Sequence, residues 1–405
     1  MSKESAQWNK NDLFGRQYID NPYPTYAYLR SNDPIHWNEG LNSWVVTRYG
    51  DVVDGLKDPR LTVKREKVKF KELDIEQRRQ VRTLEDFFSN WFLYIDPPDH
   101  TRLRGVVNKA FSPLAVEQRR VAIENIVETQ LDVVEGVSKP DILRDFSLPV
   151  SLHVVATLLG ERPEDYKEIT EWTDDIMGFF LGKNKGYDAM LRAQKSFDGF
   201  SSHLATVFSA NTDHSLTSIL GSLKAALKEG VLSKQEAESI YGNILLDGQE
   251  PISNGIANGI YALIMNPEQK KLLTTHPELV EPATEELLRY ESPFQLSCRV
   301  ASDDIFYRGK RIKKGQKIYL MLASANRDPD HFQNPDGLNI KRTDRQYAFG
   351  SATHFCLGAS LARTTLQTAY LSVLDRFPQI ETAQEKLEWQ PYFSIRELKS
   401  LPVKI

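Results

Sequence analysis

Apolar residues recur at intervals of three and four along most of the chain, which is the spacing of amphipathic helices. The pattern is helical from about 115 to 290, where Ile123, Val127 and Leu131 follow one another at intervals of four. A last long helix is predicted over residues 357–376. The chain is therefore expected to be mainly α-helical.

The longest predicted helix follows Ser233 and ends near Met265. Ser233 and Glu236 have the Ser-x-x-Glu spacing of a capping box, which marks a helix start. Four glycines and Pro251 interrupt the apolar residues that follow. So many helix breakers predict either a distorted helix or no continuous helix at all.

Short apolar runs predict a small amount of β-structure near both ends of the chain. Residues 35–38 and 44–47 are expected to be two strands joined by a turn, and residues 51–58 a short helix. Gly309 and Gly315 mark turns between later strands. These later strands are expected at 299–301, 305–307 and 317–320.

Composition is that of an ordinary globular protein, with 40% hydrophobic and 26% charged residues. No repeat or linker divides the sequence, so residues 1–405 are expected to form a single domain. The net charge of −4 gives no sign of a nucleic-acid partner. The polar N-terminus and the lack of a long apolar run predict a cytoplasmic protein without a membrane segment. The two cysteines are too far apart in sequence for a disulfide framework or zinc site, and Cys298 lies in no motif, so we interpret it as an ordinary buried residue.

Cys356 stands between a glycine-bearing loop and a predicted helix, within residues 347–363. Helix N-terminal amides stabilise negative charge, so this position favours a thiolate. Phe349 would shield the sulfur from water, and Gly350 and Gly358 would let the backbone approach a flat ligand. From position alone, however, a lone cysteine is more often a buried structural residue than a ligand.

The string Phe349-Gly350-x-x-x-His354-x-Cys356-x-Gly358 resembles the haem-binding signature of the cytochrome P450 family. The resemblance implies that Cys356 is the iron ligand of haem b (iron-protoporphyrin IX). It also implies that His354 donates a hydrogen bond to a haem propionate. A cysteine thiolate on haem iron favours cleavage of the O–O bond, which is the chemistry of an oxidoreductase that activates O2.

Residues 96–104 supply a second part of the resemblance. His100 and Arg104 are four residues apart, so a helix would place them on one face, where they suit a carboxylate partner. Spacing alone is equally compatible with a solvated basic face. The segment resembles the helix that binds haem propionates in the family, and this implies that role for both residues. Arg299 resembles a further propionate ligand, and the alternative for it is a surface charge at a strand edge.

Glu286 and Arg289 resemble the structural Glu-x-x-Arg motif of the family, with Arg342 as the expected third member. The resemblance runs through the whole chain and is closest to soluble bacterial members. It implies a mainly α fold with a small β region and haem between two long helices. Further matching segments are 325–329, 332–340 and 394–403.

The predicted central helix departs from the family where Ala-Gly-x-Asp/Glu-Thr is usual. The usual threonine hydroxyl helps to deliver protons, and Pro251 has no hydroxyl. Asp247 replaces a small residue, and a buried carboxylate is costly unless it is paired or protonated. It would bind a polar group of the substrate, hold water, donate a proton, or turn away to bond backbone or a neighbouring side chain. Glu250 matches the usual acid and would relay protons from solvent.

The resemblance implies an enzyme that uses O2 to oxidise a small, largely apolar or aromatic metabolite, in biosynthetic or secondary metabolism. The sequence has no Gly-x-Gly-x-x-Gly fingerprint, so electrons are expected from a separate ferredoxin or flavodoxin with its reductase. Because Pro251 replaces the usual threonine, the second alternative is a haem-thiolate enzyme that uses peroxide or rearranges its substrate without a reductase. A non-catalytic haem-binding or carrier-protein-binding module is the third alternative.

Family topology also implies which residues line the substrate pocket and which dock the redox partner. The expected pocket segments are 87–93, 174–181, 293–296 and 393–395. Their aromatic residues favour an apolar substrate with a polar handle for Asp247, although aromatic stripes are more often core than pocket. The expected docking residues are Arg102, Lys109, Arg345 and Arg363.

Overall fold

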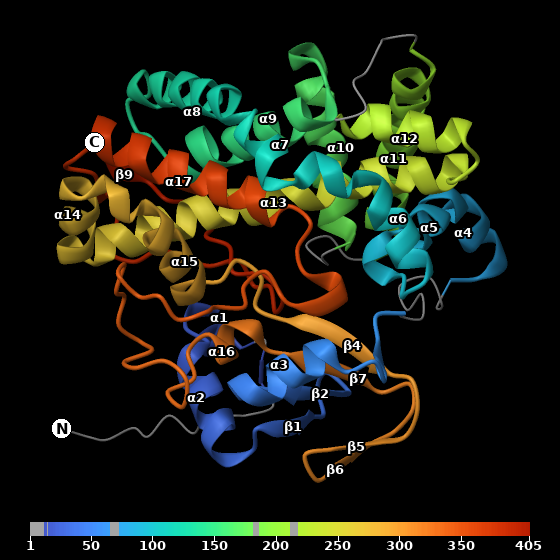
Figure 1. Cartoon of the computed structure of the whole chain (residues 1–405), viewed down its shortest axis with the longest axis horizontal. Helices are drawn as coiled ribbons and strands as arrows, with labels where there is room; N and C mark the ends of the chain where they lie inside the picture. Colours follow the sequence, from blue (N-terminus) through green and yellow to red (C-terminus); the bar gives the residue numbers. More distant parts are fainter. Residues whose placement is uncertain (1–11, 14, 65–72, 181–185, 211–217) are drawn as a thin grey trace. The chain divides into compact units, whose positions relative to one another are not determined.

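The computed structural model describes the chain except residues 1–11, 14, 65–72, 181–185 and 211–217 (Figure 1). The polar N-terminal segment and residue 181 of the expected pocket therefore lie outside the described residues. Contacts divide the chain into two compact units, each made of separate segments. Unit 1 comprises Met1–Thr62, Asn258–Cys356 and Thr382–Leu401, and unit 2 comprises Val63–Ala257, Leu357–Glu381 and Pro402–Ile405.

A five-stranded sheet in unit 1 joins the two ends of the sequence, as predicted. The central pairing of β2 with β7 is parallel and sets Val46 opposite Leu320. Val46, Ile318 and Leu320 are completely buried in the core beside this sheet. The strand order is β1 (Ile35–Asn38), β2 (Ser43–Val46), β7 (Lys317–Leu320), β4 (Ser297–Ala301) and β3 (Leu61–Thr62).

Unit 1 also contains a hairpin of β5 (Ile305–Tyr307) and β6 (Lys310–Ile312). The predicted turn at Gly309 is confirmed: Arg308 and Gly309 have φ angles of 47° and 84°, as a tight two-residue hairpin turn requires. Strand β6 was not predicted, because three residues are too few to show the alternation of apolar and polar positions that marks a strand.

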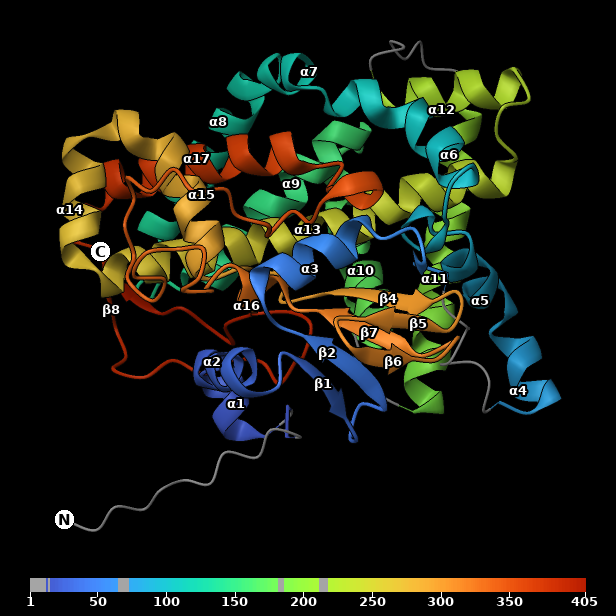
Figure 2. The ribbon, with the colours of Figure 1, turned by 60° about the horizontal axis from the view of Figure 1, so that its bottom comes forward.

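Short helices complete unit 1, and one of them, α3, lies beside the sheet (Figure 2). Helix α3 contacts β7, and a Cβ added at Gly55 would lie 2.6 Å from the Leu320 side chain, so glycine permits this close packing. The predicted helix at 51–58 is confirmed as α3, and the helical pattern predicted to end near 290 ends with a 3-10 turn followed by α15. The helices are α1 (Arg16–Asp20), α2 (Tyr23–Asn32), α3 (Tyr49–Lys57), α14 (Pro267–Thr275), α15 (Val280–Tyr290) and α16 (Leu322–Ala325).

Unit 2 is built from helices, and α8 and α17 lie side by side within it (Figure 1). A two-stranded sheet of β8 (Glu381–Thr382) and β9 (Val403–Lys404) lies near the C-terminus. The α-helices are α4 (Ile75–Gln80), α5 (Arg82–Ser89), α6 (Asp99–Val107), α7 (Pro113–Glu117), α8 (Arg120–Glu135), α9 (Leu148–Leu159), α10 (Tyr166–Phe180), α11 (Tyr187–Ser209), α12 (Ile219–Lys228), α13 (Lys234–Met265) and α17 (Ala359–Arg376). Helix α13 belongs to unit 2 as far as Ala257, and its residues from Asn258 on belong to unit 1.

The long helix α13 begins at the predicted capping box. The Ser233 amide donates to the Glu236 carboxylate at 2.8 Å, and the Glu236 amide donates to the Ser233 hydroxyl at 3.2 Å. The helix is continuous through Pro251, so the alternative of a broken segment is wrong. Among the helices described, none has an apolar stretch long enough to cross a bilayer.

Candidate active site

Cys356 lies at the end of a loop that its own backbone closes. The Cys356 amide donates to the Phe349 carbonyl at 3.0 Å, and the Gly350 amide donates to the Tyr347 carbonyl at 2.9 Å. Helix α17 begins three residues after Cys356, which confirms the predicted position between a loop and a helix. The cysteine is half-buried, whereas Cys298 is buried as expected.

The two glycines beside Cys356 serve different purposes. Gly350 has a φ of 69°, a conformation that favours glycine, so it is needed for the turn itself. A Cβ added at Gly358 would meet no protein atom within 4 Å, so protein does not fill the space beside it. Open space therefore lies beside Gly358, whereas the φ angle explains the need for glycine at position 350.

His100 and Arg104 share one face of α6 in unit 2. His100 is only 1% exposed, so the alternative of a solvated basic face is wrong for it. Burial lowers the pKa of His100, and the nearby Arg104 guanidinium lowers it further. Arg104 is half-buried, and its Nε donates to the Asn108 side chain at 3.3 Å.

Arg299 and His354 lie in unit 1 with Cys356. Arg299 is on β4, which has a neighbouring strand on each side, and only 5% of it is exposed. Its Nη1 donates to the Ser297 hydroxyl at 2.7 Å and to the Cys298 carbonyl at 2.9 Å. The alternative of a surface charge at a strand edge is therefore wrong. His354 is half-buried in the short turn before Cys356.

Asp247 and Glu250 lie in the part of α13 that belongs to unit 2. Burial raises the pKa of Asp247 to about 7, and the charge of Glu250 adds to the rise. Among the described residues no side chain or backbone group hydrogen-bonds the Asp247 carboxyl, so it has not turned away to bond backbone or a neighbour. Pro251 has no N–H to donate to the Asp247 carbonyl one turn before it.

Four aromatic residues of the expected pocket in unit 2 pack against one another: Phe87, Phe88, Trp91 and Phe180. Phe88 stacks on Phe180 with ring centroids 4.8 Å apart, and Trp91 lies 4.7 Å from the same ring. Trp91 is completely buried, and its indole Nε1 has no hydrogen-bond partner among the described residues. In unit 1 the expected segments 293–296 and 393–395 pair through backbone hydrogen bonds.

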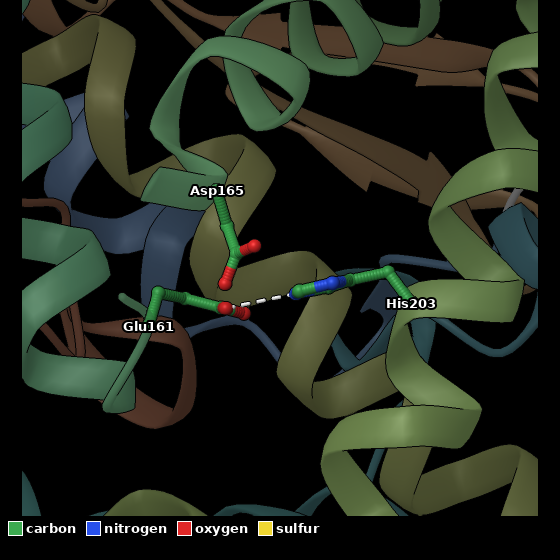
Figure 3. Close-up of side chains that lie close together, drawn as sticks. All are labelled: Glu161, Asp165 and His203. Atoms are coloured by element: carbon green, nitrogen blue, oxygen red, sulfur yellow. Dashed lines mark hydrogen bonds and ion pairs between the residues drawn. The ribbon is translucent and has the colours of Figure 1, made fainter. Parts of the chain in front are cut away.

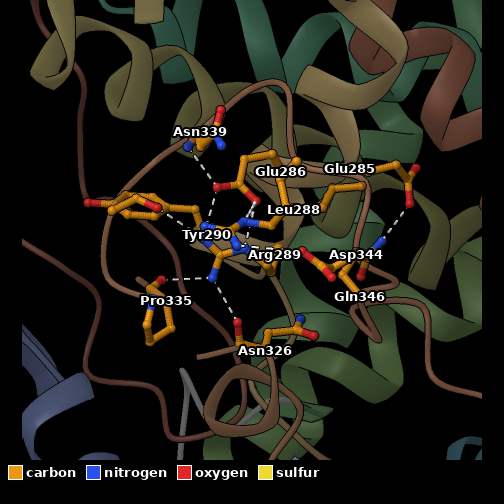
Figure 4. Close-up of polar contacts among 12 residues, drawn as sticks. Glu285, Glu286, Leu288, Arg289, Tyr290, Asn326, Pro335, Asn339, Asp344 and Gln346 are labelled. Carbon is orange, nitrogen blue, oxygen red and sulfur yellow. Dashed lines mark hydrogen bonds and ion pairs between the residues drawn. The ribbon is translucent and has the colours of Figure 1, made fainter. Parts of the chain in front are cut away.

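The predicted Glu286–Arg289–Arg342 network is present in unit 1, and Figure 4 shows the pairing of Glu286 with Arg289. Arg289 donates to both oxygens of Glu286 at 2.6 and 2.9 Å, and neither side chain has any exposed surface. Arg342 donates to the same carboxylate at 3.0 Å. Arg289 also donates to the carbonyls of Asn326 and Pro335, each at 2.8 Å, so it ties α15 to the chain that follows the sheet.

A second polar cluster was not predicted, because its members come from separate elements and form no motif (Figure 3). Glu161, Asp165 and His203 are within reach of a common metal ion. Each carboxylate already has protein partners: Glu161 accepts from His203 at 2.8 Å and from the Tyr241 hydroxyl at 2.5 Å, and Asp165 pairs with Arg162 at 3.0 Å. The hydrogen bond with Glu161 raises the pKa of His203. We therefore interpret the cluster as a structural tie between α9, α11 and α13.

The expected docking residues differ in their exposure to solvent and in whether they already form an ion pair. Arg102 is bound to Glu236 at 2.6 Å, so its charge is partly neutralised. Lys109 and Arg345 are exposed, and Arg363 is half-buried.

The donor groups suit haem: a thiolate is a ligand for iron, and imidazole and guanidinium groups suit propionates. A helical protein with a small sheet and such a cysteine loop has the features of a haem-thiolate oxidoreductase. The chain belongs to the cytochrome P450 family, whose model, described as Cytochrome P450, matches residues 66–396. Members bind haem b, and membership makes the chain an enzyme, so the alternative of a non-catalytic module is wrong.

Relatives match the chain over nearly its full length. The polyketide biosynthesis cytochrome P450 PksS of Bacillus subtilis (strain 168) is 34% identical, covering 96% of this chain and 97% of that protein. The biotin biosynthesis cytochrome P450 of the same organism is 32% identical, with 96% and 97% covered. A crystal structure of P450BioI with acyl carrier protein ligated to hexadec-9Z-enoic acid has a TM-score of 0.86 at 31% identity, covering 96% of this chain and 99% of that one.

Proposed function

We propose that this enzyme is a monooxygenase that uses O2 to oxidise a small, largely apolar or aromatic metabolite in a biosynthetic pathway, with Cys356 as the iron ligand. Haem, when bound, supplies the oxygen chemistry. The observation that carries the proposal is the closed loop that holds Cys356 half-buried just before α17. Relatives in polyketide and biotin biosynthesis support a biosynthetic role.

Four basic side chains are proposed to hold the haem propionates. Charge-assisted hydrogen bonds from imidazole and guanidinium groups suit two carboxylates. His100 and Arg299 are buried, which suits groups that would hold the propionates of a haem away from water. The proposed residues are His100, Arg104, Arg299 and His354.

Asp247 and Glu250 are proposed to move protons in place of the missing threonine. A carboxyl group with a pKa of about 7 can hold a proton and release it near neutral pH, and burial sets that value at Asp247. Glu250 is half-buried one turn further along α13, where it can exchange protons with solvent. The Asp247 carboxyl would hold the proton next to the substrate, and Glu250 would replace it.

Electrons are proposed to come from a ferredoxin or flavodoxin with its reductase. Exposed basic residues support the docking of such acidic partners. Lys109 and Arg345 are the better candidates, because Arg102 is already paired with Glu236. Pro251 supports a second candidate function, a peroxide-using or substrate-rearranging enzyme, because it lacks the hydroxyl that normally assists proton delivery.

The iron ligand is tested by the Soret band of the reduced protein with carbon monoxide. The wild type and Cys298→Ser should show the red-shifted band of thiolate ligation, and Cys356→Ser should lose it. Loss of the band in Cys298→Ser alone would overturn the assignment. Product yield with O2, ferredoxin and reductase, compared with peroxide alone, then separates the two candidate functions.

A further inference from the structure

Four polar residues form a stripe along one face of α13 within unit 2. At 100° per residue they fall within about 60° of one another around the helix axis. Most of the other side chains in this part of α13 are buried and apolar. The polar stripe consists of Asn243, Asp247, Glu250 and Asn254.

The other sides of α13 pack closely against protein. A Cβ added at Gly242 would lie 2.7 Å from the Phe87 ring, and one at Gly255 would lie 2.9 Å from Leu366. A Cβ at Gly248 would meet Val155 at 3.4 Å. These glycines point about 100° or more away from the middle of the polar stripe. The polar stripe is therefore not the face through which these neighbours hold the helix.

Asn243 is 3% exposed, and its Nδ2 has no hydrogen-bond partner among the described residues. Nδ2 of Asn254, also on the polar stripe, is likewise without a partner among the described residues, whereas some other amides in or next to helices bond to a carbonyl one turn before them. Asn90 and Asn266 donate to the carbonyl four residues before them at 2.8 Å, and so does Gln249. Asn243 has the same option with Ser239 and does not take it. A buried donor without a partner costs free energy, so its presence calls for an explanation, and a ligand that satisfies it is the explanation developed for Asn243.

Asp247 lies one turn after Asn243 and supplies the complementary group. Side chains four residues apart on a helix are neighbours, with Cβ atoms about 5–6 Å apart. In the described chain the Asp247 carboxyl accepts no hydrogen bond. The pair thus presents one N–H donor and one carboxyl acceptor, both unused, at adjacent positions on one face.

We propose that Asn243 and Asp247 bind an amide group of the substrate, with Nδ2 of Asn243 donating to the amide carbonyl and the Asp247 carboxyl accepting the amide N–H. A carboxylate ligand would be repelled by Asp247 and Glu250. An amine would leave Nδ2 of Asn243 unsatisfied, whereas an amide satisfies both groups. This inference rests on the proposed function, because it names the substrate class for that site.

A series of matched probes tests the proposal on the haem-loaded protein. Isothermal titration calorimetry would compare N-ethyldecanamide with ethyl decanoate, N-ethyldecylamine, tridecan-3-ol and tridecane. The ester lacks the N–H, and the amine lacks the carbonyl. The alcohol has its hydrogen-bond donor and its acceptor on a single oxygen. The wild type should bind the amide about tenfold or more tightly than each of the others, which is the effect of one hydrogen bond to a charged or buried group.

Variants assign the preference to the two residues. Asn243→Leu and Asp247→Ala should each reduce the preference for the amide over the ester to about twofold or less. Gln249→Leu is the matched control: Gln249 is a buried amide of α13 that lies off the polar stripe and already donates to the Leu245 carbonyl at 2.8 Å, so the preference should stay. Equal binding of amide and ester, equal binding of amide and alcohol, no binding of the amide, or a preference that survives in both variants would overturn the proposal.

The probe series on the wild type needs no variant, so the proposal is testable even if a substitution prevents folding. The carbon monoxide spectrum of the same preparation separates the two proposals. A normal thiolate band without amide preference overturns only the substrate class. Loss of the thiolate band in the wild type overturns the proposed function.

Discussion

Removal of Arg289 is expected to destabilise the protein strongly. Arg289→Met keeps the length and apolar volume of the side chain but removes its charge and its donors. Glu286 stays fully buried, with Arg342 as its remaining cationic partner, and the carbonyls of Asn326 and Pro335 each lose a donor. Breaking a fully buried ion pair costs about 3–5 kcal/mol, and we expect Arg289→Met to fall in that range.

Urea unfolding of the haem-loaded protein, followed by circular dichroism, measures this loss. Arg311→Met is the control, because Arg311 pairs with Asp304 at 3.0 Å on the surface, with side chains 63% and 50% exposed. It should cost less than about 1 kcal/mol. Adding Glu286→Leu to Arg289→Met should cost less than the two single changes summed, since neither member of the fully buried pair is left without the other and Arg342 keeps Asp344 at 3.6 Å. Equal, small losses in Arg289→Met and Arg311→Met would refute the reasoning.

Four further predictions concern other residues of the proposed site and of the second polar cluster. His100→Ala or Arg104→Ala should each weaken haem retention, by about 1.5–3 kcal/mol for a charge-assisted contact, and normal haem content in the double variant would reject the propionate role. The folded-state pKa of Asp247 is about 7, above the ordinary ~3.9, so stability should fall as the pH rises from about 4 to 7, and Asp247→Asn should remove that dependence in urea titrations. Pro251→Thr should increase product per electron consumed and decrease peroxide release, if the missing hydroxyl limits turnover. Because the pKa of His203 is raised in the folded state, His203→Phe should cost more stability below pH ~6.5 than above the raised pKa, and equal losses at pH 6 and 9 would contradict this.

Short-range patterns in the sequence were sufficient to predict several secondary-structure elements and the position of Cys356 between a loop and a helix. The capping box at Ser233 and Glu236 marks the start of α13, because its hydrogen bonds span only three residues. Glu286 and Arg289 are one helical turn apart, so their pairing follows from spacing once a helix forms. The position of Cys356 between a loop and a helix could also be predicted, because it depends only on residues close to it in sequence.

Tertiary structure decided what depends on residues far apart in the chain. Strand β2 pairs with β7, and the Trp44 indole N–H donates to Gln316 at 2.9 Å across 272 positions. Glu161 and His203 form their pair across 42 positions, and no sequence pattern connects them. In the sequence, the glycines of α13 indicate breaks in the helix. In the structure, Leu366 packs closely against the helix at Gly255.

The polar residues of α13 show which properties the sequence determines and which properties the tertiary structure determines. Sequence alone showed that Asp247 and Pro251 replace residues usual in the family, but left open whether Asp247 turns away. Only the folded chain shows that the Asp247 carboxyl is desolvated and that Nδ2 of Asn243 is buried without a partner among the described residues. Helical spacing determines which residues share a face, because it acts over a few residues. Burial and pKa depend on every segment that packs around that face, and the path of the whole chain determines them.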